Sequence, residues 1–302
     1  MDSESNKIQK LKKEKDAVIL AHYYVEDDVQ ALADYVGDSY YLSKVAAELP
    51  NKTIVFCGVS FMGESAKILC PEKTIIMPDA SAHCPMAYMA DIEKIKKIRK
   101  QYEDLAVACY INSTAEIKAN SDVCVTSSNA LKIIKRLPQK NIYFIPDANL
   151  GRYIASLVPE KNFIFNDGYC HVHTGITKKD VEQAKKAHPE ALVLAHPECT
   201  LDVLNIADYV GSTSGIISNA TTGEAESYII CTESGILYEL NKRNPNKNYY
   251  VIGNGHLCQD MKKITTDKVI SSLENMSNQV ELDETIRRKA VNALTKMLEL
   301  AE

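Results

Sequence analysis

The hydrophobic and polar positions of this chain follow the same order three times. Each copy starts with a short apolar strand, passes through a polar break into a helical stretch, and continues with a short apolar piece and hydroxyl residues. The copies read VILAHYYVEDDVQALADYVGDSYYL (18–42), AVACYINSTAEIKANSDVCVTSSNAL (106–131) and LVLAHPECTLDVLNIADYVGSTSGII (192–217). Repetition of this kind indicates one supersecondary unit used three times.

The three copies also keep a common spacing when they are aligned on His22, Tyr110 and His196. An aspartate follows each anchor by 12 residues, a hydroxyl residue by 17, and a cysteine in a turn by 60 to 62. The matching residues are Asp34, Asp122 and Asp208, then Ser39, Ser127 and Thr213, and finally Cys84, Cys170 and Cys258. We therefore interpret most of the chain as a triplication.

Short apolar strands that alternate with short helices are typical of parallel βαβ units. The sequence predicts an α/β fold with three similar small parallel-sheet domains, arranged by pseudo-threefold symmetry around a central active site. The expected domains are 1–97, 98–180 and 181–272. Residues 273–302 read as amphipathic helices, which we expect to pack back on the body, on the first domain. Other expected helices include 29–35, 60–69, 115–120, 129–137 and 180–187.

Polar residues stand where the first strand of each copy ends. Ligands of parallel sheets bind beyond the carboxyl ends of the strands, and alternation places residues i and i+2 on one face. One such pair would read equally well as hydrogen-bonded residues at the edge of the core, but three equivalent pairs indicate a site. We expect partial burial to raise the pKa of Glu198, so that it moves protons near neutral pH. The pairs are His22 with Tyr24, Tyr110 with Asn112, and His196 with Glu198.

Ser39, Ser127 and Thr213 precede helical stretches, so we expect them to be helix N-caps. The free N–H groups and the positive dipole end of a helix also attract carboxylates and phosphate. Ser212, beside Thr213, would share this task. Three helix ends around one cavity predict binding of a multiply anionic small molecule.

The chain contains nine cysteines and no C-x-x-C pair, so any metal site must be assembled from distant cysteines. The three equivalent cysteines suggest either zinc with an open fourth position or a four-iron cluster with one iron free for substrate. A mixed Cys/His zinc site also stays open, because His83, His171 and His256 lie within two residues of these cysteines. The six other cysteines are expected to be small buried apolar residues. They are Cys57, Cys70, Cys109, Cys124, Cys199 and Cys231.

Composition narrows the range of partners. The 302 residues are 45% hydrophobic and 25% charged with a formal net charge of −5, which predicts no nucleic-acid or anionic-membrane partner. No segment approaches the roughly 20 apolar residues of a membrane helix, and the polar N-terminal segment does not resemble a secretory signal. We expect a cytoplasmic protein whose cysteines stay reduced unless they bind metal.

The motifs AHYY, GDS, YIN, TSSNA, GYCHVH, HPE, GSTSG and CQDMK together resemble the quinolinate synthase family, over nearly the whole chain. The resemblance implies three α/β domains around a pseudo-threefold axis and one [4Fe-4S] cluster held by Cys84, Cys170 and Cys258. It implies condensation of iminoaspartate (iminosuccinate) with dihydroxyacetone phosphate to quinolinate, with release of phosphate and two waters, in de novo NAD biosynthesis. It also implies a functional link to the enzyme that makes iminoaspartate from aspartate.

The resemblance further assigns roles to individual residues. Tyr24, Tyr110 and Glu198 match its proton-transfer residues, and we add His22 and His196 as catalytic candidates. Some members carry extra cysteines after the third ligand, whereas CQDMK has only Cys258, so we expect no thiol switch there. The expected substrate contacts are His22, Ser39, Tyr110, Ile111, Asn112, Ser127, His196, Pro197, Glu198, Ser212 and Thr213.

Two other functions use the same residues. An aconitase-like iron–sulfur hydro-lyase would apply an open iron, acting as a Lewis acid, to a hydroxy acid. A non-catalytic metal-binding sensor or carrier would need an exposed metal and would not need the three polar pairs. A site enclosed between domains would favour the condensation, because it would protect the imine from water.

Overall fold

The computed structural model describes residues 3–302 and contains three separate four-stranded sheets. The first has β1 (Ala17–His22), β2 (Tyr35–Gly37), β3 (Thr53–Cys57) and β4 (Thr74–Ile76). The second has β5 (Leu105–Tyr110), β6 (Val123–Val125), β7 (Asn141–Ile145) and β8 (Asn162–Phe165). The third has β9 (Leu192–Ala195), β10 (Tyr209–Val210), β11 (Ser227–Cys231) and β12 (Asn248–Val251).

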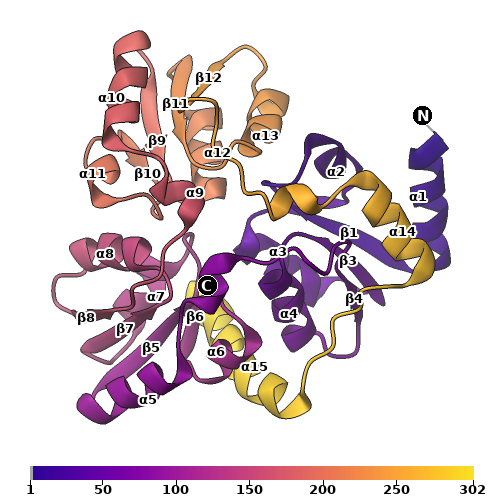
Figure 1. The fold of residues 1–302 in the computed structure, drawn as a ribbon, viewed down its shortest axis with the longest axis horizontal. Helices are drawn as coiled ribbons and strands as arrows, with labels where there is room; N and C mark the ends of the chain where they lie inside the picture. Colours follow the sequence, from indigo (N-terminus) through magenta and orange to yellow (C-terminus); the bar gives the residue numbers. More distant parts are fainter. Residues whose placement is uncertain (1–2) are drawn as a thin grey trace.

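All three sheets are parallel and have the same strand order, β2-β1-β3-β4, β6-β5-β7-β8 and β10-β9-β11-β12. The sheets form three lobes around a common centre (Figure 1). The first strand of each sheet is central and almost wholly buried, as expected for apolar runs covered by helices on both faces. The predicted α/β class with three similar parallel-sheet domains is confirmed.

Helices connect and cover the strands. The first lobe has α1 (Ser3–Glu14), α2 (Asp27–Leu32), α3 (Ser39–Glu48), α4 (Ser60–Leu69) and the 3-10 helix η1 (Pro85–Tyr88). Next along the chain come α5 (Ile92–Gln101), α6 (Ala115–Ala119), α7 (Ala130–Arg136) and α8 (Ala148–Leu157). The second repeat ends with α9 (His171–Thr174), directly after Cys170, and the third carries α10 (Lys178–Ala187), α11 (Leu201–Leu204), α12 (Thr213–Thr222), α13 (Ile236–Arg243) and the 3-10 helix η2 (Met261–Lys263). The helix expected over 29–35 ends earlier, because Tyr35 starts β2.

The repeated aspartates have a structural role. Each carboxylate accepts a hydrogen bond from a backbone N–H in the first strand of its own sheet, and thereby joins the loop before the second strand to the first. The bonds run to Asp34 from Ile19 (2.8 Å), to Asp122 from Val107 (2.7 Å) and to Asp208 from Val193 (2.7 Å).

A lysine repeats in the same way, 51 residues after each anchor. Its ammonium group donates to carbonyl oxygens at the C-terminal end of the helix that follows the second strand, where the helix dipole favours a cation. The three contacts are Lys73 with Ala46 at the end of α3 (2.8 Å), Lys161 with Gln139 just beyond α7 (2.7 Å), and Lys247 with Ala220 at the end of α12 (2.8 Å).

The expected limits of the repeats fall inside helices. Residues 97, 180 and 272 fall inside α5, α10 and α14 (Thr266–Asn275), and Figure 1 draws α5 with the second sheet. The repeat spacing aligns equivalent residues but does not say where the chain crosses from one lobe to the next.

The C-terminal helices pack on two lobes. Helix α14 contacts α1 and β3 of the first repeat, while α15 (Glu284–Ala301) lies mainly against α6, β6 and α7 of the second, and also against α4. We expected both on the first domain. The difference arises because the apolar side of α15, with Ala290 and Leu294 fully buried, fills the space between the two repeats. Among residues 3–302, no helix is long and apolar enough to cross a membrane.

Candidate active site

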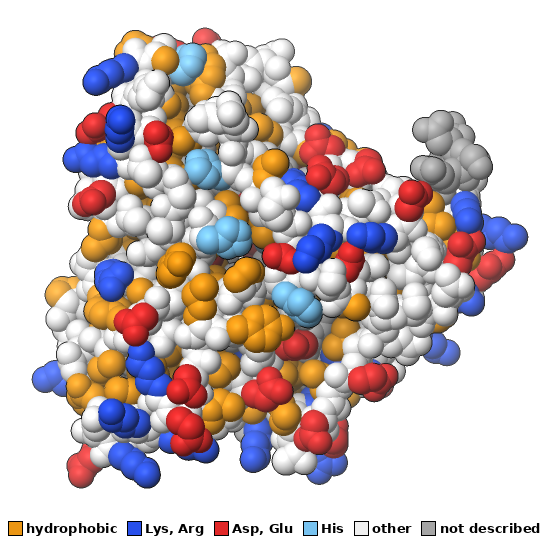
Figure 2. Space-filling model, viewed as in Figure 1, with side chains coloured by type: hydrophobic (Ala, Val, Ile, Leu, Met, Phe, Trp, Pro, Cys, Tyr) orange, Lys and Arg blue, Asp and Glu red, His pale blue; other side chains and the backbone are white. Residues whose placement is uncertain are grey.

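A cavity lies between the three lobes, beyond the carboxyl ends of the strands. It contains about 760 Å³ of space free of protein atoms, part of which is open to solvent. In Figure 2, hydrophobic side chains and histidines gather near the middle of this face, where the lobes meet. Thirteen of the residues singled out in the sequence line the cavity. They are His22, Tyr24, Ser39, Tyr110, Asn112, Ser127, His171, His196, Glu198, Thr213, Cys84, Cys170 and Cys258.

Three expected substrate contacts lie outside the cavity lining. Ile111 is buried and its backbone N–H donates to Val125, which continues the pairing of β5 with β6. Pro197 is buried in the turn between His196 and Glu198. Ser212 caps a helix, so its hydroxyl is already used. Spacing alone could not separate these residues from their neighbours.

The expected N-caps are displaced by one or more residues. The cap of α3 is Asp38, whose carboxylate accepts from the backbone N–H of Tyr41 at 3.0 Å, and the cap of α12 is Ser212. Ser39 and Thr213 are the first helical residues after these caps. Ser127 lies before α7, whose cap position is Asn129. The hydroxyls of Ser39 and Thr213 are therefore not needed for capping.

The two strand-end histidines share one geometry. The backbone N–H of Tyr24 donates to Nδ1 of His22 at 3.2 Å, and that of Glu198 donates to Nδ1 of His196 at 3.3 Å. Burial lowers the pKa of His22 to about 4 and that of His196 to about 3. Both rings are therefore neutral near pH 7 and carry their proton on Nε2. Nε2 of His22 can donate one hydrogen bond to an oxygen of a ligand, while Nε2 of His196 lies 3.3 Å from Oγ of Ser127, which also lines the cavity.

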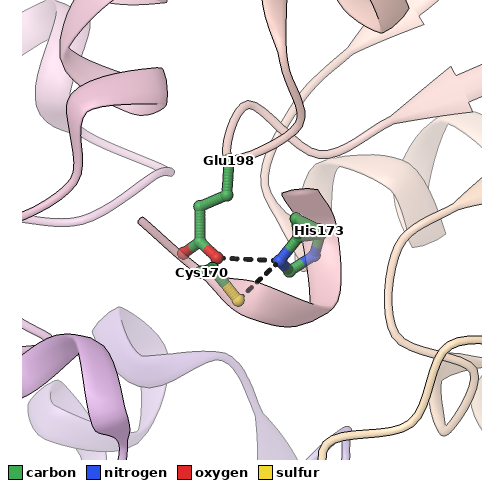
Figure 3. A group of neighbouring side chains, drawn as sticks. All are labelled: Cys170, His173 and Glu198. Atoms are coloured by element: carbon green, nitrogen blue, oxygen red, sulfur yellow. Dashed lines mark hydrogen bonds and ion pairs between the residues drawn. The ribbon is translucent and has the colours of Figure 1, made fainter. Parts of the chain in front are cut away.

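Glu198 is tightly held by two partners, Tyr110 and His173, of which Figure 3 shows His173. Oε1 accepts from the hydroxyl of Tyr110 at 2.5 Å, and Oε2 lies 2.8 Å from Nδ1 of His173. Burial by itself would raise the pKa of Glu198, but the nearby imidazoles of His173 and His196 and these hydrogen bonds outweigh it and lower the pKa. The expected raised pKa is wrong, since the sequence did not show that imidazoles would surround the carboxylate.

A continuous chain of hydrogen bonds extends from Glu198 to Tyr24. Nε2 of His173 lies 2.8 Å from Oγ1 of Thr232, which lies 2.9 Å from the hydroxyl of Tyr24. The Tyr24 hydroxyl also lies 2.7 Å from Oγ1 of Thr213. Burial raises the pKa of Tyr24 and of Tyr110 well above the usual value, so both phenols keep their protons.

Sequence reasoning missed His173 and Thr232. His173 lies three residues after Cys170, on the same face of the short helix α9, and this spacing was the available signal. Thr232 carries no comparable signal, because it is an ordinary residue after a strand.

The three equivalent cysteines face the cavity and are partly exposed, whereas the six others are buried, as predicted. A short turn follows each of these cysteines, and backbone N–H groups of the turn lie close enough to the sulfur to lower the pKa of the thiol. The donors are Met86 and Ala87 at Cys84, His173 at Cys170, and Asp260 and Met261 at Cys258. Burial nevertheless raises the pKa to about 12 for Cys84 and about 11 for Cys258. Thiolates at this site therefore need a metal to stabilise them.

One smaller group of side chains could also hold a metal ion. Cys170, His173 and Glu198 offer ligand atoms within 4.8 Å of one another, and within residues 3–302 this is the one such group. The histidines considered from the sequence, His83, His171 and His256, do not belong to it.

Comparison with known proteins agrees with this geometry. The family model described as Quinolinate synthetase A protein matches residues 6–299. The quinolinate synthase of Clostridioides difficile is 53% identical over 98% of this chain and 97% of its own length. Those of Fusobacterium nucleatum and Caldicellulosiruptor bescii are 52% and 51% identical over 98% of this chain, and over 99% and 97% of their own lengths. The chain therefore belongs to the quinolinate synthase family of enzymes.

Proposed function

We propose that this enzyme condenses iminoaspartate with dihydroxyacetone phosphate to form quinolinate, phosphate and two waters, as a step of de novo NAD biosynthesis. The proposal includes a [4Fe-4S] cluster held by Cys84, Cys170 and Cys258. The observation that carries it is the meeting of these cysteines with all three strand-end pairs in one cavity.

The spacing of the cysteines supports a cluster over a single zinc ion shared by all three. Zinc binds thiolate sulfur at about 2.3 Å, so three sulfurs on one ion lie roughly 4 Å apart. Within residues 3–302, the three sulfurs do not form a group with all distances under 4.8 Å. A cluster takes each thiolate on a different iron and needs this wider separation.

When bound, the cluster would supply a Lewis-acidic iron that eases the loss of water from a substrate. The chain itself would bind and orient the anionic substrates. Neutral His22 and His196 donate hydrogen bonds through Nε2, and the N-terminal ends of α3 and α12 present backbone N–H groups. The side-chain oxygen of Asn112 is buried at the cavity without a partner, which suits it to accept from a substrate hydroxyl or imine.

Proton movement falls to Glu198 and the two tyrosines. Glu198, held as a carboxylate, takes up a proton as general base and returns it as general acid. Tyr110 donates to it, and the hydrogen bonds through His173 and Thr232 connect it with Tyr24, which also lines the cavity. A proton taken up at Glu198 can thus be delivered at Tyr24.

Enclosure of the cavity fits an unstable imine substrate, which hydrolyses in water. Hydrogen bonds cross each border between repeats. Ser128 donates to Asp38 at 2.9 Å, Tyr110 donates to Glu198, and Tyr24 bonds to Thr213. Opening of some of these contacts would widen the entrance for substrate.

Anaerobic purification tests the proposal. We expect about four irons per chain, a broad visible absorption, and quinolinate formation from both substrates together. Zinc in place of iron would favour the group Cys170, His173 and Glu198 and would contradict the cluster. Dehydration of a citrate- or tartrate-type acid without use of dihydroxyacetone phosphate would support the hydro-lyase instead. Bound metal without turnover of either kind would support a sensor.

A further inference from the structure

Two buried carboxylates stand at equivalent places in the second and third repeats. Asp147 and Glu233 each lie 37 residues after their anchor, two residues beyond β7 and β11, and both have no exposed surface. The equivalent residue of the first repeat is Val59. Ionisable side chains are rarely buried so completely unless they have partners, so their partners reveal their role.

Glu233 holds the loop that carries Cys258. Oε1 accepts from the backbone N–H of Cys258 at 3.1 Å and lies 3.5 Å from Nζ of Lys262, while Oε2 accepts from Gly235 at 2.6 Å. The N–H of Lys262 donates to the carbonyl of Cys258 at 3.1 Å. One carboxylate therefore fixes both ends of the turn that begins at the cysteine.

Asp147 has a similar place beside Cys170. Its Oδ1 caps α8 by accepting from Leu150 at 2.7 Å. The other oxygen, Oδ2, is buried with no hydrogen-bond partner among the described residues. A hydrogen bond from the cysteine amide to the buried carboxylate is therefore present in the third repeat, where Glu233 accepts from Cys258.

A backbone bond next to these carboxylates occurs in all three repeats. The residue after the carboxylate position donates its N–H to the carbonyl of the residue two before the cysteine. The bonds are Ser60 to Ala82 (2.9 Å), Ala148 to Gly168 (2.8 Å) and Ser234 to His256 (2.8 Å). The chain therefore places each cysteine turn against the end of its own third strand, and in the third repeat Glu233 adds a contact to the cysteine itself.

We propose that Glu233 is a positioning residue, which fixes the backbone of Cys258 so that its sulfur is oriented for the cluster. This inference rests on the proposed function. In the first repeat Val59 offers no acceptor, and the Cys84 turn is instead tied to the third repeat, where Oδ1 of Asp260 accepts from the N–H of His83 at 3.2 Å. The cluster would thus be held through the third repeat at two of its three ligands.

The test is the rate at which an iron chelator removes the cluster from reconstituted protein, followed anaerobically by visible absorbance. Partners behind metal ligands typically change affinity by 10- to 100-fold. We expect bleaching of Glu233→Leu to be about 10-fold faster than that of the unmodified enzyme. Glu233→Gln keeps an acceptor oxygen and should restore a rate within about 2-fold, a rescue that general loosening of the fold would not give. Glu233→Asp keeps the charge but withdraws the acceptor from the Cys258 amide, should also bleach faster, and decides the test if Glu233→Leu does not fold.

Glu239→Leu is the matched control, because Glu239 is a buried carboxylate of the same repeat whose partner is Arg243 at 2.7 Å. Bleaching of Glu233→Leu at the unmodified rate, or equal acceleration by Glu239→Leu, would overturn the inference. Unmodified enzyme that binds no iron at all would instead refute the proposed function, so the two failures are distinguishable.

Discussion

The first and third repeats have the same strand order and the same histidine geometry, but they place different chemistry around it. In both, an imidazole accepts a backbone N–H at Nδ1 and presents Nε2 to the cavity. The residue two positions on is Tyr24 in the first repeat and Glu198 in the third. The comparison teaches that backbone hydrogen bonds maintain the scaffold, while side chains at equivalent positions acquire separate tasks.

The largest expected effect tests whether the first and third repeats each supply a cysteine ligand to the metal. We expect Cys84→Ser and Cys258→Ser to lose most of the iron and to show only background quinolinate formation, because each removes a soft thiolate ligand. Iron per chain and turnover measure this. Cys57→Ala and Cys231→Ala are controls, since both thiols are buried in strands. A Cys258→Ser protein with full iron content would contradict the ligand assignment.

The next effect tests the unequal roles of Glu198 and Tyr24. Glu198→Gln removes the general base but keeps an acceptor for Tyr110, and kcat should fall by about 100- to 10,000-fold. Tyr24→Phe should lower kcat less, because the Tyr24 hydroxyl is hydrogen-bonded to the hydroxyls of Thr213 and Thr232 rather than to Glu198 itself. Steady-state kinetics with both substrates separates the two, and near-normal turnover of Glu198→Gln would refute its role.

Acidification tests the histidines that the two repeats share. The pKa of His22 is lowered to about 4 and that of His196 to about 3, both by burial, so only the unfolded chain takes up these protons just below pH 6.5. Stability is therefore unaffected above about pH 6.5 and falls as the pH drops toward 4, by about 2 kcal/mol per histidine at pH 5. Denaturant unfolding at pH 7 and pH 5 measures the loss.

The matching variants are His22→Gln, which should reduce this pH dependence, and the exposed His83→Gln, which should not. An unchanged slope in His22→Gln would show that its imidazole is not buried neutral. Glu198 does not affect this comparison. Because its pKa is lowered in the folded protein, its contribution to the free energy of unfolding declines only when the pH falls below the ordinary glutamate pKa of 4.5.

The smallest effect concerns the link between the two repeats. Thr232→Val removes the hydroxyl between His173 and Tyr24, and kcat should fall by roughly 10-fold, the equivalent of one hydrogen bond. Thr232→Ser should restore most of the rate. Equal kcat for Thr232→Val and the unmodified enzyme would show that the chain of hydrogen bonds carries no proton during turnover.

The sequence predicted what the repeat itself encodes. The sheets, the strand-end pairs and the three cavity-facing cysteines follow from equivalent positions, so one register located them all. The same alignment of the three copies also picked out Asp34 and its equivalents, which proved to have a structural role. Spacing therefore located repeated residues without distinguishing their tasks.

What has no counterpart in the other copies could not be predicted this way. His173 and Thr232 occur once, and the lowered pKa of Glu198 depends on an imidazole brought from a neighbouring lobe. The position of α15 depends on the shape of the space between two repeats, which no local pattern describes. The N-caps of α3 and α12 are Asp38 and Ser212, one residue before the expected Ser39 and Thr213. The side chains of Asp38 and Ser212 accept the hydrogen bonds from the backbone N–H groups of the first helical turn.

The lysines at the far ends of the crossover helices have one more consequence. Lys73 and Lys247 hold the C-terminal ends of α3 and α12, and the opposite ends of these helices face the cavity. Each helix has ten residues and is therefore about 15 Å long. Because a lysine fixes the C-terminal end of each helix, the helix cannot tilt freely at its N-terminal end. Residues remote from the cavity therefore help to orient the backbone N–H groups that face it.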